Sequence, residues 1–249
     1  MIAAGSAPNA ADGGKRPNWL NALPSRQPYI GDRKMVEALA RHSMVKASAS
    51  GWTAVMSRYP ELASEPIVAG WVHAGRPLIV RRPACSDTAG MIPLGLPLPP
   101  SHGKRRIAIS LAAADIVASA PPPLLADAAA TAPAAWGETI DELIQLLPET
   151  RTFGSLAWQH LTGLRYLSNS SDLDLLWPLS AARRGDTLPS DIARIAQRAP
   201  MRLDGEIVGP AGGVQWRELT GADEDEVLVK GPTGVTSTTR AAFLAGHVS

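Results

Sequence analysis

The sequence RTFGSLAWQ at residues 151–159, followed by SDLDLLW at residues 171–177, decides the fold of this chain. Its pattern of apolar residues predicts a short strand over 151–153, a helix over 156–161 and a second strand over 172–177. The chain therefore passes from a strand through a Gly-Ser turn into a helix. It then returns to the sheet in a strand that carries two aspartates.

The Gly-Ser turn predicts a phosphate-binding site. A phosphate must approach the backbone closely, and Gly154 leaves room for it because glycine has no Cβ atom. The hydroxyl of Ser155 and the free N–H groups at the start of the helix can donate to phosphate oxygens, and the helix dipole favours negative charge there. Serine is also a common helix N-cap, so a plain capping role for Ser155 is the alternative.

The two aspartates predict a metal site. Strand alternation places Asp172 and Asp174 on one face of their strand, with Leu173 and Leu175 on the other. Apolar residues continue to Trp177 and indicate a buried strand, where two unpaired carboxylates are costly without a cation. Paired carboxylates suit Mg²⁺, which neutralises phosphate charge. The alternative is an acidic strand face that points to solvent.

A third carboxylate is expected from MRLDGEIV at residues 201–208, which we predict to be a strand. Asp204 is the first candidate and Glu206 the second, because both lie on one face of that strand. For either residue the alternative is a salt bridge to Arg202 or Arg217.

The remaining patterns predict an α+β protein in two parts. We expect residues 1–28 to form a disordered tail and residues 29–131 to form a smaller N-terminal α+β domain. Residues 132–249 would carry the motifs above on a mixed sheet with flanking helices. Further predicted elements are helices over 32–46, 139–147 and 190–197 (Ser190 as N-cap), strands over 67–72, 77–81 and 106–111, an irregular proline-rich loop over 92–100, a linker over 119–133, and apolar segments over 214–219 and 226–230 after a turn at 212–213.

Composition excludes several classes of protein. The net charge of +1 gives no reason to expect nucleic acid as a partner. Cys85 is the single cysteine, so an internal disulfide and a multi-cysteine metal site are excluded, and a reducing cytoplasm is expected. No stretch approaches the roughly 20 apolar residues that span a bilayer. We see no signal peptide at the start of the sequence and expect no membrane partner.

Basic residues supply further candidates for phosphate binding. Arg81 and Arg82 follow a predicted strand, and Lys230 ends an apolar segment. A basic run at residues 104–106 could meet a phosphate-bearing substrate or an acidic partner, although charged runs are usually solvated surface. His160 lies on the helix after the Gly-Ser turn, where a packing or surface role is the simpler interpretation.

A longer set of motifs resembles the malonate decarboxylase holo-acyl-carrier-protein synthases, also called phosphoribosyl-dephospho-CoA transferases. The three-part pattern of Gly-Ser, Asp-x-Asp and a third acid also looks like the DNA polymerase β-like nucleotidyltransferases, the superfamily in which we expect this family to lie. The resemblance covers most of the chain from about residue 66. It rests on GSLAWQ at 154–159, LTGLRYL at 161–167, SDLDLLW at 171–177, LDGE at 203–206 and WREL at 216–219, together with Arg81-Arg82 and GLPLPP at 95–100.

The resemblance implies a specific reaction. A phosphoribosyl-dephospho-CoA group would pass from 2′-(5″-triphosphoribosyl)-3′-dephospho-CoA to a serine of the malonate decarboxylase acyl-carrier subunit, with release of pyrophosphate. It implies that Asp172 and Asp174 hold Mg²⁺, and that Asp204 or Glu206 completes the site or takes the serine proton. Gly154 and Ser155 would grip the leaving pyrophosphate. The rivals are a related enzyme acting on the citrate lyase carrier protein, and a non-catalytic relative that binds donor or carrier.

Overall fold

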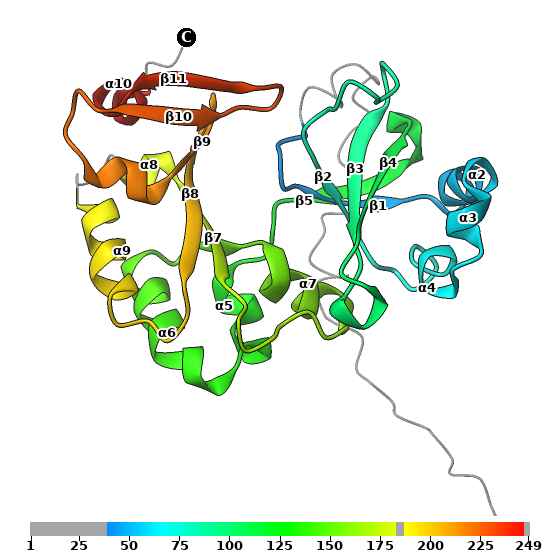
Figure 1. Cartoon of the computed structure of the whole chain (residues 1–249), viewed down its shortest axis with the longest axis horizontal. Helices are drawn as coiled ribbons and strands as arrows, with labels where there is room; N and C mark the ends of the chain where they lie inside the picture. Colours follow the sequence, from blue (N-terminus) through cyan, green and yellow to red (C-terminus); the bar gives the residue numbers. More distant parts are fainter. Residues whose placement is uncertain (1–38, 183–186, 247–249) are drawn as a thin grey trace, which may run out of the picture.

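The computed structural model describes residues 39–182 and 187–246, which form two α+β units joined near a run of three prolines (Figure 1). The predicted α+β class is confirmed, because each unit combines one sheet with its own helices. The predicted tail over residues 1–28 lies outside the described residues. None of the described helices has the length and apolar character needed to cross a membrane.

The first unit is an antiparallel sheet covered on one face by short helices. The strand order is β4-β3-β2-β1-β5. Alternate residues such as Val45, Leu78 and Leu94 point into a core that also contains Trp52 and Trp71 from the helical side. Helices α2–α4 lie on the side of the sheet away from the second unit (Figure 1). The elements are β1 (Met44–Ala47), α2 (Ala49–Arg58), α3 (Pro60–Ala63), α4 (Pro66–Ala69), β2 (Leu78–Val80), β3 (Ile92–Pro97), β4 (Arg106–Leu111) and β5 (Ile116–Ala120).

The second unit contains a six-stranded mixed sheet in the order β11-β10-β9-β8-β7-β6. Strands β7 and β8 are parallel, and the other paired strands are antiparallel. This arrangement confirms the predicted mixed sheet with flanking helices. The elements are α5 (Leu125–Ala128), α6 (Gly137–Leu146), β6 (Arg151–Thr152), α7 (Gly154–Thr162), β7 (Leu173–Pro178), α8 (Leu179–Ala182), α9 (Leu188–Ala196), β8 (Leu203–Gly209), β9 (Gly212–Gln215), the 3₁₀ helix η6 (Trp216–Thr220), β10 (Glu226–Lys230), β11 (Val235–Thr239) and α10 (Arg240–Ala245).

The prediction of an irregular loop over 92–100 was wrong, because most of it is strand β3. Its residues alternate between apolar side chains in the core and Pro93, Gly95 and Pro97 on the other face. The carbonyl of Pro93 accepts from the Arg81 N–H. The missing donors therefore face β2, which pairs with β3 over only two residue pairs. Pairing with β4 continues over the whole strand.

Three other local predictions were also wrong. The strand predicted over 67–72 is helix α4 and the turn after it, since Pro66 occupies the first turn of a helix that ends at Gly70. The helix predicted over 32–46 is, in its described part, a turn followed by strand β1. Helix α9 begins before Ser190, with Thr187 as its N-cap and no side-chain cap.

The two units share an extensive contact through α7. Trp158 and Leu161 of this helix, and Tyr166 after it, are buried in the core of the first unit. The Tyr166 hydroxyl also donates to the Pro97 carbonyl at 2.9 Å. Leu125 of α5 already belongs to the second core, so the chain enters the second unit ahead of the predicted boundary at 131/132. The Gly-Ser turn that was predicted to bind phosphate therefore begins a helix that packs against both units.

Candidate active site

The parallel pairing of β7 and β8 brings two of the predicted carboxylates together. Asp174 of β7 is the direct register partner of Asp204 of β8. Asp172 lies just before β7 and is two residues from Asp174, so its charge also acts on Asp174. The three aspartates predicted as metal ligands therefore lie at the amino-terminal ends of the neighbouring strands β7 and β8.

Glycine is required at position 154 by the close approach of Asp174. The φ angle of Gly154 is +62°, and a Cβ atom there would lie 1.8 Å from Oδ2 of Asp174. The backbone N–H groups of Phe153 and Ser155 donate to Asp174, the first to its carbonyl at 3.1 Å and the second to its carboxylate. The start of α7 is thus fixed directly over this carboxylate.

Ser155 is not the N-cap of α7. The N-cap residue is Phe153, and no side chain caps the helix. The plain capping role considered for Ser155 is therefore not what the structure shows. Its side chain lines the cavity in front of Asp174.

The carboxylates form an acidic group whose charge the protein does not balance fully. Burial and, after it, the charges of Asp204 and Asp172 together raise the pKa of Asp174 to about 7, against the lowering effects of the Ser155 N–H and Arg106. Arg202 is the nearest cation to the other two, with its guanidinium nitrogens 4.0 Å from Asp172 and 3.9 Å from Asp204. These distances are too long for hydrogen bonds.

One oxygen of Asp204 is already fully engaged. Its Oδ1 accepts from the Gly205 backbone N–H at 2.9 Å and from the side-chain amide of Gln215. The other oxygen, Oδ2, faces Arg202. The two hydrogen bonds at Oδ1 therefore fix the orientation of the Asp204 carboxylate and leave Oδ2 as the oxygen that could bind a cation.

The donor chemistry of the three aspartates fits Mg²⁺, a hard cation that prefers carboxylate oxygens. The charges of Asp204 and Asp172 add to the effect of burial on the pKa of Asp174, and a bound cation would offset both effects. Among the described residues, however, no three acidic, histidine or cysteine side chains yet converge on one point. Asp172 and Asp174 would have to rotate toward the cation, with water completing its coordination.

Glu206 has a different environment from Asp204, although both belong to β8. It is only 5% exposed, and it accepts from the Arg41 guanidinium at 2.9 and 3.1 Å and from Lys230 at 3.1 Å. Burial alone would raise the pKa of Glu206, but His42, Arg41 and Lys230 outweigh it and hold the pKa below its ordinary range. The structure thus pairs two predicted site residues, Glu206 and Lys230, with each other.

A cavity of about 510 Å³ faces the acidic group from the first unit. Gly154, Ser155 and Asp174 line it on one side. Strands β2–β4 and their loops line the opposite side and contribute several cations and apolar side chains. The basic lining residues are Arg41, Arg81, Arg82, Lys104 and Arg106.

The two arginines predicted for phosphate binding differ in availability. Arg81 is bound in two hydrogen bonds to Asp87, at 2.7 and 2.5 Å, and these hold the pKa of Asp87 down at about 2. Its Nε also donates to the Leu94 carbonyl. In Arg82 the buried Nε has no hydrogen-bond partner. Arg82 is therefore the better placed of the two to bind a phosphate.

Two contacts at the site could not be predicted from the sequence. Arg41 lies in a segment predicted to be helical, and nothing in its neighbours indicated that it would reach Glu206. Gln215 was included only as part of an apolar segment after a turn. The first contact joins the two units and the second joins two strands of one sheet. Both join residues that are not neighbours in the sequence, so no local pattern predicts them.

Comparison with known proteins assigns the family. Residues 40–122 match the phosphoribosyl-dephospho-CoA transferase MdcG N-terminal domain, and residues 124–241 match the corresponding C-terminal domain. No solved structure matches the chain.

Curated relatives agree with the family models. A phosphoribosyl-dephospho-CoA transferase of Bradyrhizobium diazoefficiens is 40% identical over 211 residues, covering 83% of this chain and 92% of the relative. One from Xanthomonas euvesicatoria is 38% identical, covering 72% of this chain and 86% of the relative. One from Pseudomonas putida is 32% identical, covering 65% and 78%. This chain thus belongs, over both of its units, to the MdcG family of phosphoribosyl-dephospho-CoA transferases.

Proposed function

We propose that this chain transfers a phosphoribosyl-dephospho-CoA group from 2′-(5″-triphosphoribosyl)-3′-dephospho-CoA to a serine of the malonate decarboxylase acyl-carrier subunit. The transferase activity follows from the family. The specific donor and acceptor are our proposal. The observation that carries the proposal is the pairing of Asp174 with Asp204 beneath the Gly154-Ser155 turn. This arrangement also supports a polymerase β-like nucleotidyltransferase core.

The reaction is an in-line displacement at the phosphorus nearest the ribose. The serine Oγ forms a bond to that phosphorus, the bond to the bridging oxygen of the leaving pyrophosphate breaks, and the serine proton passes to a base. Little covalent chemistry is required of the protein, so positioning and charge neutralisation supply most of the catalysis.

Asp172, Asp174 and Asp204 are the residues that would hold Mg²⁺. When bound, Mg²⁺ would neutralise charge on the triphosphate and on the departing pyrophosphate. The mutual repulsion that raises the pKa of Asp174 would then be relieved.

Asp204 is a better candidate than Glu206 for the third carboxylate. Its Oδ1 is fixed by Gly205 and Gln215, and its Oδ2 has Arg202 nearby only at 3.9 Å, so this oxygen could bind a cation. Glu206 is instead neutralised by Arg41 and Lys230, and its lowered pKa makes it a poor proton acceptor.

The cavity between the units suits the phosphates of the donor. The Ser155 hydroxyl, Arg82, Lys104 and Arg106 line it within reach of the start of α7. Arginine binds phosphate through paired N–H donors, and the positive end of the helix dipole adds to this attraction. We therefore place the pyrophosphate leaving group between the Gly154-Ser155 turn and these cations.

The test is the mass of the carrier subunit after incubation with the donor and Mg²⁺. We expect a mass gain equal to one phosphoribosyl-dephospho-CoA group, with one pyrophosphate released per carrier and no gain in EDTA. The same assay with the citrate lyase carrier protein tests the acceptor. A gain on that carrier alone would contradict the malonate decarboxylase assignment.

Matched variants test the metal ligands in the same assay. Asp172→Asn should abolish the mass gain while leaving the thermal unfolding midpoint close to that of wild type. Asp191→Asn, which alters an exposed aspartate paired with Arg194, should transfer normally. Wild-type turnover by Asp172→Asn would contradict the role given to that carboxylate.

A further inference from the structure

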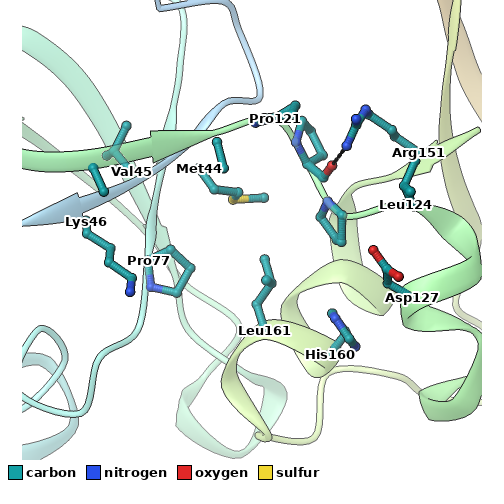
Figure 2. A pocket seen from close by; sticks show the side chains of 14 residues that line it. Met44, Val45, Lys46, Pro77, Pro121, Leu124, Asp127, Arg151, His160 and Leu161 are labelled. Carbon is teal, nitrogen blue, oxygen red and sulfur yellow. Dashed lines mark hydrogen bonds between the residues drawn. The ribbon is translucent and has the colours of Figure 1, made fainter. Parts of the chain in front are cut away.

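A second cavity lies between the two units, and no step of the proposed reaction uses it. We call it the seam pocket; its volume is about 590 Å³. Met44, Ala118 and Ala120 of the first sheet line one side, and Leu124, His160 and Leu161 of the second unit line the other. Figure 2 shows Met44 and Leu161 pointing into it from opposite sides.

The seam pocket and the catalytic cavity lie next to each other on one face of the first sheet. Met44 of β1, which lines the seam pocket, is the direct cross-strand partner of Ile79 of β2, which lines the catalytic cavity. On the opposite wall, Leu161 lines the seam pocket and Trp158 lines the catalytic cavity. The two cavities are thus separated by about one strand spacing and one helical turn.

The walls of the seam pocket are mainly apolar. The three consecutive prolines of the predicted linker, Pro121, Pro122 and Pro123, contribute to them, together with Pro77. Met44 is an unbranched, flexible side chain that can adapt to a ligand passing it. These apolar walls suit a thin, flexible chain of methylene groups.

One end of the pocket carries polar groups. Asp127, Arg151 and His160 lie there together (Figure 2), and Arg151 donates to the Pro122 carbonyl at 2.6 Å. Burial lowers the pKa of His160, so its ring is neutral at pH 7 and can both donate and accept a hydrogen bond. Such groups can bind the amides and hydroxyl of a ligand whose body lies along the apolar walls.

The donor contains a chain of this kind. Its dephospho-CoA moiety is an adenosine diphosphate joined to a pantetheine arm of methylene groups, two amides, one hydroxyl and a terminal thiol. We propose that the seam pocket binds this pantetheine arm while the catalytic cavity binds the phosphates. The inference rests on the proposed function, because the donor is the one named there.

The experiment compares the affinities of dephospho-CoA and ADP, which differ by the arm. Titration calorimetry on the full chain should show dephospho-CoA binding at least roughly tenfold more tightly than ADP. Ala120→Phe, which fills the pocket beside Met44, should reduce this ratio to about one and leave the ADP affinity unchanged. Ala118→Phe, on the same face of β5, is a second variant in case the first does not fold.

Ser119→Phe is the matched control, because Ser119 lies between these alanines in β5 and does not line the pocket. It should keep the wild-type ratio. Equal affinities of wild type for dephospho-CoA and ADP would overturn the assignment of the arm. An equal loss of affinity for both nucleotides in the pocket variants would overturn it as well. Those results leave the transfer reaction standing. Failure of wild type to bind either nucleotide or to modify a carrier would overturn the proposed function as well.

Discussion

Strand β8 carries two carboxylates, Asp204 and Glu206, whose surroundings have opposite charge. Asp204 lies beside other aspartates, and Glu206 lies beside cations. Asp204 belongs to a group with Asp172 and Asp174 in which repulsion and burial raise the pKa of Asp174 to about 7. Two residues further along the strand, Glu206 is buried against Arg41 and Lys230, and its pKa is lowered.

The difference separates a site for an external cation from a structural ion pair. Leaving carboxylates close together without full compensation costs stability, and such a cost is typical of functional sites. Glu206 instead joins the segment before β1 to β8 and so links the two units. We therefore expect changes at Asp174 to affect chemistry and changes at Glu206 to affect stability.

The largest expected effect is that of Asp174→Asn on transfer. Loss of this carboxylate removes a metal ligand at the centre of the site, so turnover should fall roughly a thousandfold or more. Mn²⁺ binding, followed by electron paramagnetic resonance, should weaken in parallel. Normal Mn²⁺ binding by this variant would show that the acidic group is not the metal site.

Glu206→Ala should instead lower the free energy of unfolding, by roughly 3 kcal/mol in urea titrations. The cause is that Arg41 and Lys230 would be left as partly buried cations without a counterion. Glu142→Gln, which breaks an exposed pair with Arg198, is the control and should cost less than about 1 kcal/mol.

The same Glu206 variant should bind Mn²⁺ with wild-type affinity. Loss of Mn²⁺ binding at unchanged stability would remove the contrast between the two carboxylate groups. Glu206 would then be a metal ligand, as one of the alternatives from the sequence allowed.

The pH dependence of stability should differ between two aspartates in opposite environments. The pKa of Asp174 is raised to about 7, so the native state holds a proton that the unfolded chain releases near pH 4. The metal-free protein should therefore lose stability as the pH rises from about 4 to 7. Asp174→Asn should flatten this decline and raise the unfolding midpoint at pH 8 by several degrees, as measured by calorimetry in EDTA.

Asp87 provides the opposite case. Its hydrogen bonds from Arg81 lower its pKa to about 2, so the stability it contributes is present above about pH 4 and is lost toward pH 2. Asp87→Asn should leave the decline between pH 4 and 7 unchanged. If the loss of stability between pH 4 and 7 persisted in Asp174→Asn, it would have to come from other titrating groups.

The sequence predicted the catalytic half of the fold well because its signals are local. The Gly-Ser turn, helix α7 and strand β7 lie in one continuous stretch of sequence. In such a stretch the apolar periodicity and the positions of glycines predict the local secondary structure directly. Helix α7 begins two residues before its predicted range and ends one residue after it, and strand β7 is shifted by one residue from the predicted 172–177. The candidate site residues Gly154, Ser155 and Asp174 were found for the same reason, and the structure places all three at one cavity.

Features that depend on strand neighbours could not be predicted in this way. Strand β3 was not predicted because it contains two prolines, which lack an N–H donor. Nothing in the local sequence shows that these positions face β2, the shorter of the two neighbouring strands. The choice between Asp204 and Glu206 was open for a similar reason, since both lie on one strand face. The parallel register that pairs Asp174 with Asp204, and the approach of Arg41 to Glu206, separate them in space.

The smallest expected effect concerns Gln215, which holds Asp204 in position. Its amide N–H group and the Gly205 N–H both donate to Oδ1 of Asp204, so Oδ2 is the oxygen left to bind a cation. Gln215→Leu should free the carboxylate to rotate and weaken Mn²⁺ binding by roughly three- to tenfold, with a matching rise in the Mg²⁺ concentration needed for half-maximal transfer. Gln215→Asn, which keeps the amide on a shorter side chain, should recover part of the affinity. If Gln215→Leu lowers the unfolding midpoint but binds Mn²⁺ like wild type, the contact stabilises strand β9 and does not orient Asp204.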